Sequence, residues 1–151
     1  MMTTVNSEAA RWLNEARVSR DDAERQFSWT STMTANGGVQ PLFMSAEYAL
    51  KAVVVQHHGS LPKQFETHDL TWLARRINLL PQLPADLQTF VSELGQFDPN
   101  CRYPREVLFE TLVSSSTPAQ WWDRLTAATR FIDYIDHNVI GDPAVFGTLK
   151  F

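Results

Sequence analysis

The strongest structural signal in this chain is a run of apolar residues near its C-terminus with the spacing of a helix. These residues recur at alternating intervals of four and three positions: Trp121, Leu125, Ala128, Ile132, Ile135 and Val139. Such spacing places them on one side of a single helix, which then needs a partner surface. Thr117 and Gln120 fit a reciprocal N-terminal capping pair, and Gly141 fits the C-terminal stop. The segment therefore predicts a long amphipathic helix that packs in a helical bundle.

Apolar periodicity predicts helices in the rest of the chain as well. They are expected at residues 7–27, at residues 41–58 and at residues 68–97. Pro81 and Pro84 interrupt the third segment, because proline removes a backbone hydrogen bond of the helix. No segment has the alternation of apolar and polar residues that is typical of a β-strand. The predicted fold is therefore all-α: an antiparallel up-and-down four-helix bundle whose third helix is split by prolines.

The length and composition indicate one small domain. The 151 residues are expected to form a single domain over 1–151, with its core at about 7–141 and a tail at 142–151. The net charge of −4 argues against broad, non-specific binding of nucleic acid, which favours a basic surface. The single cysteine, Cys101, excludes an intrachain disulfide. With no apolar signal segment and no stretch of membrane-spanning length, we expect a cytoplasmic protein without membrane association.

Arg130 and His137 are the first candidates for catalysis, because their spacing places them on one face of the last helix. Seven positions return a helix to within ~20° of the same direction, and that direction points away from the apolar seam. One interpretation is an ordinary solvated face. The other is a dimer interface where His137 acts as general acid or base and Arg130 stabilises developing negative charge. Asp133 is then placed to orient the imidazole of His137.

Three residues in the middle of the chain are candidates for ligand binding. Lys51 lies within an apolar helix, where it either extends to the surface or pairs with a carboxylate or a phosphate. His68 and Asp69 lie at the start of the third helix, whose free N–H groups suit an anion or a nucleotide. The structural alternative is that Thr67 caps this helix and Asp69 complements its dipole.

A small basic patch is expected in the loop before the last helix, where Arg102 and Arg105 lie close together. The alternative is a buried ion pair between one of these arginines and Glu106 or Asp98. No spacing of His, Cys, Asp and Glu resembles a zinc site, so neither a metal nor another cofactor is expected.

Three short segments occur in a fixed order along the chain: Ala49-Leu50-Lys51-Ala52, Thr67-His68-Asp69-Leu70 and Arg102-Tyr103-Pro104. In this order, and over roughly residues 8 to 140, they resemble the HEPN family (higher eukaryote and prokaryote nucleotide-binding domain). The resemblance implies the helical bundle and a homodimer. It also supports an anion or nucleotide site at His68 and Asp69. Lys51, Tyr103 and Arg105 complete the candidate ligand-binding residues.

The resemblance also implies a biological setting. Small prokaryotic HEPN proteins of this kind are often encoded beside a minimal nucleotidyltransferase, in toxin–antitoxin or defence modules. The chain is then expected to bind a nucleotide, an RNA or such a nucleotidyltransferase partner, with or without catalysis. Catalytic family members are metal-independent endoribonucleases in which an Arg and a His meet across a dimer. In this chain the corresponding candidates are Arg130, His137 and Arg102.

The sequence departs from the ribonuclease pattern at two points. Phe131 follows the candidate arginine, at a position where the family usually has a polar residue. The pair Arg130 and His137 also lies in the C-terminal half of its helix, rather than near the start. Arg102 is an alternative position for the catalytic arginine, but no histidine follows it closely. The sequence therefore leaves three hypotheses: a binding protein, an active endoribonuclease and a purely structural assembly module.

Overall fold

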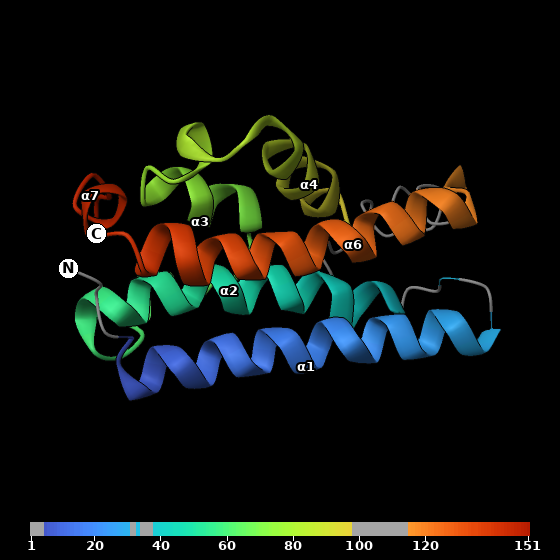
Figure 1. Ribbon diagram of the computed structural model, residues 1–151, viewed down its shortest axis with the longest axis horizontal. Coiled ribbons are helices and arrows are strands. Elements are labelled where there is room, and N and C mark those ends of the chain that lie inside the picture. Colours follow the sequence, from blue (N-terminus) through green and yellow to red (C-terminus); the bar gives the residue numbers. More distant parts are fainter. Residues whose placement is uncertain (1–4, 31–32, 34–37, 98–114) are drawn as a thin grey trace.

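The computed structural model describes residues 5–30, 33, 38–97 and 115–151, which form helices joined by turns with no strand among them. Helix α1 (Ser7–Thr30) and helix α2 (Gln40–His58) run in opposite directions and pack side by side (Figure 1). Helix α6 (Pro118–Tyr134) lies along both of them. The described part of the chain is therefore all-helical, as the periodicity predicts.

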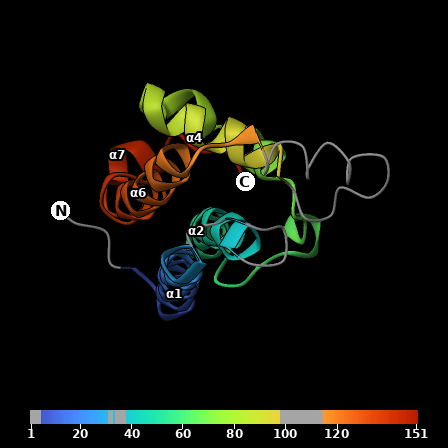
Figure 2. The same ribbon diagram turned by 90° about the vertical axis from the view of Figure 1, so that its right-hand side faces the viewer.

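A second layer of shorter helices covers α2 and α6 on the side away from α1 (Figures 1 and 2). It consists of α3 (Leu70–Arg76) and α4 (Ala85–Gly95). The 3₁₀ turn η2 (Lys63–Phe65) precedes α3, and a second turn, η3 (Leu80–Gln82), lies between α3 and α4. Helix α4 packs against α6, and this contact positions the groove described below.

Helix α3 ends earlier than the prolines alone predict. Its last residue is Arg76, and Asn78 has a left-handed backbone with φ of 62°. Asparagine adopts this conformation more readily than most residues, so the chain turns at this position. Pro81 then lies within η3, and Pro84 is the N-cap residue of α4.

Local residues explain where α1 begins and where α2 ends, and α1 runs three residues beyond the predicted end at residue 27. Asn6 caps α1, because its Oδ1 accepts the N–H of Ala9 at 2.7 Å. The side-chain amide of Asn6 also donates to the carbonyl of Val55 at 3.2 Å, which ties the start of α1 to the end of α2. Gly59 ends α2 with φ of 81°, a conformation that favours glycine.

The last helix begins as predicted and finishes in a wider form. The N–H of Gln120 donates to Thr117 Oγ1 at 3.2 Å, and the N–H of Thr117 donates to Gln120 Oε1 at 2.8 Å, which confirms the capping pair. Beyond α6 the chain continues as a π-helix, η4 (Ile135–Ile140), whose hydrogen bonds join residues five apart. Val139 and Ile140, which are adjacent in this wider segment, are both fully buried.

The predicted apolar seam is buried along its whole length, from Trp121 to Val139. Large aromatic side chains fill much of the surrounding core: Phe27, Phe43, Phe65, Phe97, Trp121 and Phe131. At the surface, Arg17 of α1 forms ion pairs with α6 and η4. Its Nη1 lies 2.7 Å from Asp133 Oδ1, and its Nη2 lies 3.2 Å from Asp136 Oδ2. The short helix α7 (Pro143–Phe146) packs against η4.

Candidate functional site

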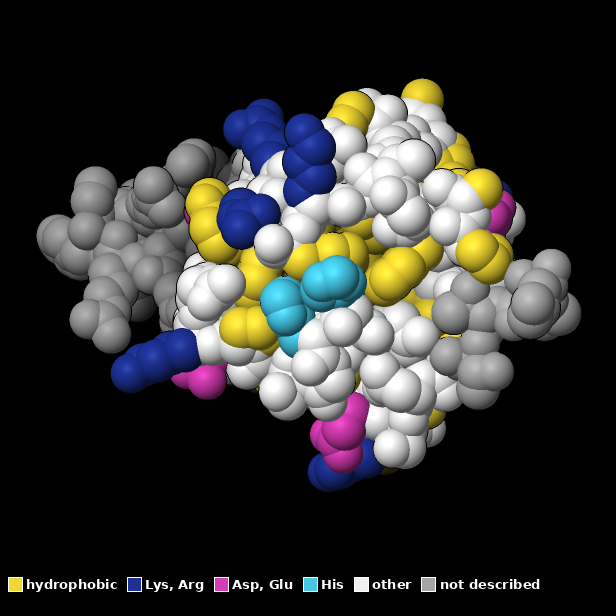
Figure 3. Space-filling model, turned by 90° about the vertical axis from the view of Figure 1, so that its left-hand side faces the viewer, with side chains coloured by type: hydrophobic (Ala, Val, Ile, Leu, Met, Phe, Trp, Pro, Cys, Tyr) yellow, Lys and Arg dark blue, Asp and Glu magenta, His cyan; other side chains and the backbone are white. Residues whose placement is uncertain are grey.

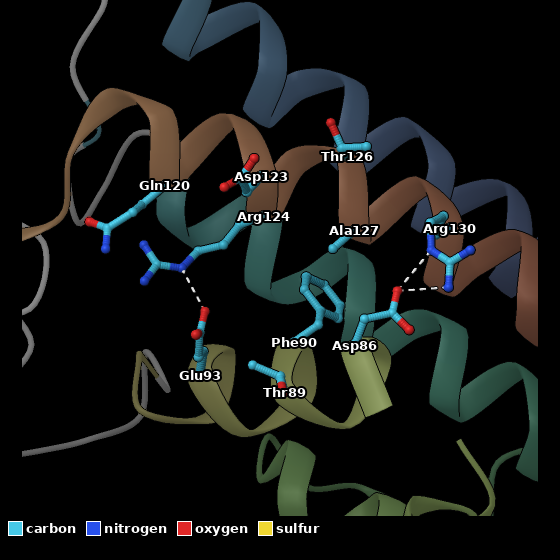
Figure 4. A pocket seen from close by; sticks show the side chains of 10 residues that line it. All are labelled: Asp86, Thr89, Phe90, Glu93, Gln120, Asp123, Arg124, Thr126, Ala127 and Arg130. Atoms are coloured by element: carbon cyan, nitrogen blue, oxygen red, sulfur yellow. Dashed lines mark hydrogen bonds and ion pairs between the residues drawn. The ribbon is translucent and has the colours of Figure 1, made fainter. Parts of the chain in front are cut away.

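An open groove of about 670 Å³ lies between α4 and α6 (Figure 4). Phe90 and Ala127 contribute apolar surface, while Thr89, Thr126 and Gln120 contribute hydroxyl and amide groups. Such a mixture of apolar surface and a few polar groups is typical of sites for small organic ligands. The groove is therefore a candidate binding site.

The charged side chains of this groove are two arginines and three carboxylates: Arg124, Arg130, Asp86, Glu93 and Asp123. Their formal charges leave the groove with a net charge of −1. A long polyanion such as RNA gains affinity mainly from a surplus of positive charge, which these side chains do not supply. Each arginine nevertheless carries a planar fork that matches a carboxylate or a phosphate.

Arg130 lies at one rim of the groove and bridges α6 to α4. Its Nη2 lies 2.7 Å from Asp86 Oδ2, and its Nε donates to the same oxygen at 3.0 Å. Both side chains are 56 % exposed. Ion pairs this exposed contribute only about 0–1 kcal/mol, so a ligand anion can replace Asp86 at little cost.

Arg124 is held much more firmly than Arg130. Its Nε lies 3.2 Å from Glu93 Oε2, and its Nη1 donates to Ser116 Oγ at 3.0 Å. The guanidinium carbon lies 4.5 Å from the ring centre of Trp121 and 5.4 Å from that of Phe97. With these contacts and 13 % exposure, the role of Arg124 is to fix one wall of the groove.

His137 does not line the groove that contains Arg130. It is exposed on η4, and its side chain forms no hydrogen bond or ion pair with another residue of the described ranges. The interpretation that Asp133 orients His137 is wrong, because Asp133 binds Arg17. Within one copy of the chain, Arg130 and His137 therefore belong to different surroundings.

Lys51 and His68 are brought together by a residue that sequence reasoning missed, Glu47. Lys51 Nζ donates to Glu47 Oε2 at 3.0 Å, and His68 Nδ1 lies 2.7 Å from Glu47 Oε1. The side chains of Glu47 and Lys51 are only 2 % and 6 % exposed, whereas that of His68 is 50 % exposed. Pairing of Lys51 with a carboxylate is thus confirmed, and its extension to the surface is wrong.

Asp69 has a structural role at the start of α3. Its Oδ1 accepts the N–H of Trp72 at 3.0 Å, so Asp69 itself is the N-cap residue. The interpretation that Thr67 caps the helix is wrong, because Thr67 Oγ1 accepts the N–H of Asp69 instead. The remaining candidates, Arg102, Tyr103 and Arg105, lie outside the described residues.

The two histidines at the end of α2 pack on aromatic rings (this end of the molecule is seen in Figure 3). The ring of His57 stacks on Phe151 with centroids 4.2 Å apart, and His58 meets the same ring nearly at right angles. Burial and the neighbouring His57 lower the pKa of His58 below its ordinary value.

Within the described ranges, no group of three His, Cys, Asp or Glu side chains is placed to hold a metal ion.

Sequence patterns differ in how well they reveal these residues. Glu47 precedes Lys51 by four positions in an apolar helix, and this spacing is a usable signal for an ion pair on one helix face. Asp86 and Glu93 carry no such signal, because their arginine partners lie more than thirty positions away in the sequence.

Among the described helices, none combines the length and apolarity needed to cross a bilayer.

No protein-family model, curated protein or solved structure matches the chain.

Proposed function

We propose that this protein is a binding module of the HEPN type that holds a nucleotide in the groove between α4 and α6. The observation that carries the proposal is the exposed ion pair of Arg130. Its side chain is half exposed and is bound to the equally exposed Asp86. A phosphate oxygen that takes the place of Asp86 receives the same charge-assisted hydrogen bonds. Ala127 then contacts the apolar part of the ligand, beside the small exposed part of Phe90, and the hydroxyl groups of Thr89 and Thr126 contact its polar edges.

A mononucleotide suits this groove better than an RNA strand. One phosphate group needs only one arginine fork, and the half-exposed Arg130 provides it. An RNA strand presents a phosphate at every nucleotide and meets three carboxylates in the groove and a net charge of −4 on the whole chain. The charge balance therefore favours a small ligand.

The biological part of the proposal follows from the HEPN resemblance. It includes the four-helix bundle with a split third helix, the homodimer and a role in a toxin–antitoxin or defence module in the cytoplasm. The partner is a minimal nucleotidyltransferase, an enzyme that itself uses nucleotides. The all-helical structure of the described residues is compatible with this assignment.

Two variants are expected to change nucleotide affinity in opposite directions. Arg130→Ala removes the phosphate ligand and is expected to weaken binding about tenfold, since charge-assisted hydrogen bonds are the strong ones. Asp86→Asn removes the competing carboxylate and is expected to tighten binding about threefold. Isothermal titration calorimetry with AMP and ATP measures both effects.

Arg25→Ala is the matched control for this titration. Arg25 also pairs with a nearby carboxylate, Asp22, at 2.9 Å, but it lies on α1 and outside the groove. This variant is expected to bind as the wild type does. The absence of saturable nucleotide binding would contradict the proposal. An equal loss of nucleotide affinity in Arg25→Ala and Arg130→Ala would contradict it as well.

An endoribonuclease is the second candidate, and one observation favours it. Arg130 and His137 are both exposed on successive elements of the last helix, so a second copy of the chain can reach them. Under this hypothesis the two residues act together across a dimer, with His137 as general acid or base. This function does not need the groove to hold a separate ligand.

RNA cleavage in EDTA separates the two candidates. We expect no cleavage by the wild type, because the groove beside Arg130 has no surplus of positive charge to hold an RNA strand. Cleavage that persists in the chelator and disappears in both Arg130→Ala and His137→Ala would contradict this expectation and establish the nuclease. Equal cleavage by all three proteins would indicate a contaminating enzyme.

A further inference from the structure

A second recess, separate from the groove, lies between the first half of α1 and the middle of α2. It has a volume of about 330 Å³ and is lined by Glu8, Arg11, Trp12, Glu15 and Tyr48. No residue is shared with the groove between α4 and α6. The function proposed above leaves this recess unexplained.

Two aromatic rings form a corner in this recess. The rings of Trp12 and Tyr48 lie 5.5 Å apart between centroids, with an angle of 63° between their planes. Trp12 comes from α1 and Tyr48 from α2, so the packing of these two helices fixes the corner. Both side chains are half buried, which leaves part of each ring open to the recess. The negative faces of aromatic rings attract cations.

The charges around the corner also favour a cation. Glu8 is bound to Arg11 at 3.0 Å, so these two side chains compensate each other. Glu15 forms no hydrogen bond or ion pair with another residue that the structure describes, and its carboxylate stays uncompensated. The pKa of Tyr48 is raised by burial first and by the charges of Glu47 and Glu15 next, so negative potential reaches its hydroxyl.

We infer that this recess binds a methylated ammonium group, with Trp12 and Tyr48 as aromatic walls and Glu15 as the counter-charge. A methylated ammonium spreads its charge over its methyl groups and loses little hydration when it contacts a ring face. A bare ammonium needs several hydrogen-bond acceptors to replace its water, and the recess offers one free carboxylate. Choline, a trimethyllysine side chain and a phosphatidylcholine headgroup share this chemistry.

The test compares choline with 3,3-dimethylbutan-1-ol, its neutral isostere, in titrations followed by NMR of the tryptophan indole signals at constant ionic strength. We expect saturable binding of choline and about fivefold weaker binding of the isostere. Glu15→Gln is expected to weaken choline binding about fivefold as well. Glu66→Gln is the control, because Glu66 is exposed and lies outside the recess.

A trimethyllysine peptide and phosphatidylcholine vesicles, titrated in the same way, distinguish the sources of the group. Tighter binding of either one than of choline supports the inference and identifies the source. Equal binding of choline and its neutral isostere overturns the inference. The absence of saturable binding by choline, the peptide and the vesicles also overturns it. A loss of choline affinity in Glu66→Gln equal to that in Glu15→Gln overturns it as well. Nucleotide binding in the groove is measured separately, so failure here leaves that proposal intact.

Discussion

Glu47→Leu is expected to lower the free energy of unfolding by about 3–5 kcal/mol, because it leaves the ammonium group of Lys51 buried without its carboxylate. Water cannot compensate this charge, since Lys51 is 6 % exposed. The loss is a large part of the total stability of a domain, which is about 5–15 kcal/mol. Urea denaturation followed by circular dichroism measures it directly.

The double variant Glu47→Leu/Lys51→Met tests the cause of this loss. Removal of both charges leaves an apolar pair of similar volume, and such replacements are often neutral or stabilising. We therefore expect the double variant to be within about 1 kcal/mol of the wild type, or above it. His68 loses its partner in both variants, but it is half exposed and can bind water instead. If the double variant is less stable than Glu47→Leu, burial of the unpaired charge is not the cause.

An exposed ion pair provides the matched control for this series. Asp22 and Arg25 lie 2.9 Å apart on the surface of α1, where water surrounds both side chains. Asp22→Ala is expected to change the stability by less than about 0.5 kcal/mol. A loss as large as that of Glu47→Leu would mean that burial does not determine the effect.

Phe131→Ala is expected to destabilise the protein by about 3–5 kcal/mol, because it opens a cavity in the centre of the core. The ring of Phe131 is fully buried and lies 5.5 Å from that of Phe90, between centroids. Phe90 in turn lines the groove, so the same variant is expected to weaken nucleotide binding. Phe131→Ser is expected to be less stable still, since it adds a buried hydroxyl group.

Thermal and urea denaturation measure these losses, with Trp29→Ala as the control. Trp29 is an equally large apolar residue but is 89 % exposed, so its removal is expected to cost less than about 0.5 kcal/mol. Similar stability of Phe131→Ala and the wild type would contradict the described packing. The burial of Phe131 also gives a physical reason why this position is apolar in this chain.

The sequence predicts the elements that depend on local chemistry. The seam from Trp121 to Val139 and the capping pair of Thr117 and Gln120 each follow from a short pattern, and the structure confirms them. These features depend on neighbours within a few positions, where helix geometry is fixed.

Contacts between distant segments are not predictable in the same way. The pairing of Asp86 with Arg130 and that of Glu47 with His68 depend on how the helices pack, and no spacing in the sequence reveals that packing. Helix α3 ends early because Asn78 adopts a left-handed backbone. A proline is the stronger sequence signal for a helix end, so the predicted end lies near Pro81 instead. The candidate site is therefore less predictable than the fold.

The π-helix η4 has a consequence for how this chain aligns with any relative. A π-turn holds one residue more than an α-turn over a similar stretch of axis. A relative whose last helix stays in the α form would therefore align with a one-residue gap between Ile135 and Ile140. Without that gap, residues beyond Ile140 would be paired one position out of register. The spacing between Arg130 and Gly141, which spans the whole π-helix, would then correspond to a spacing one residue shorter in that relative.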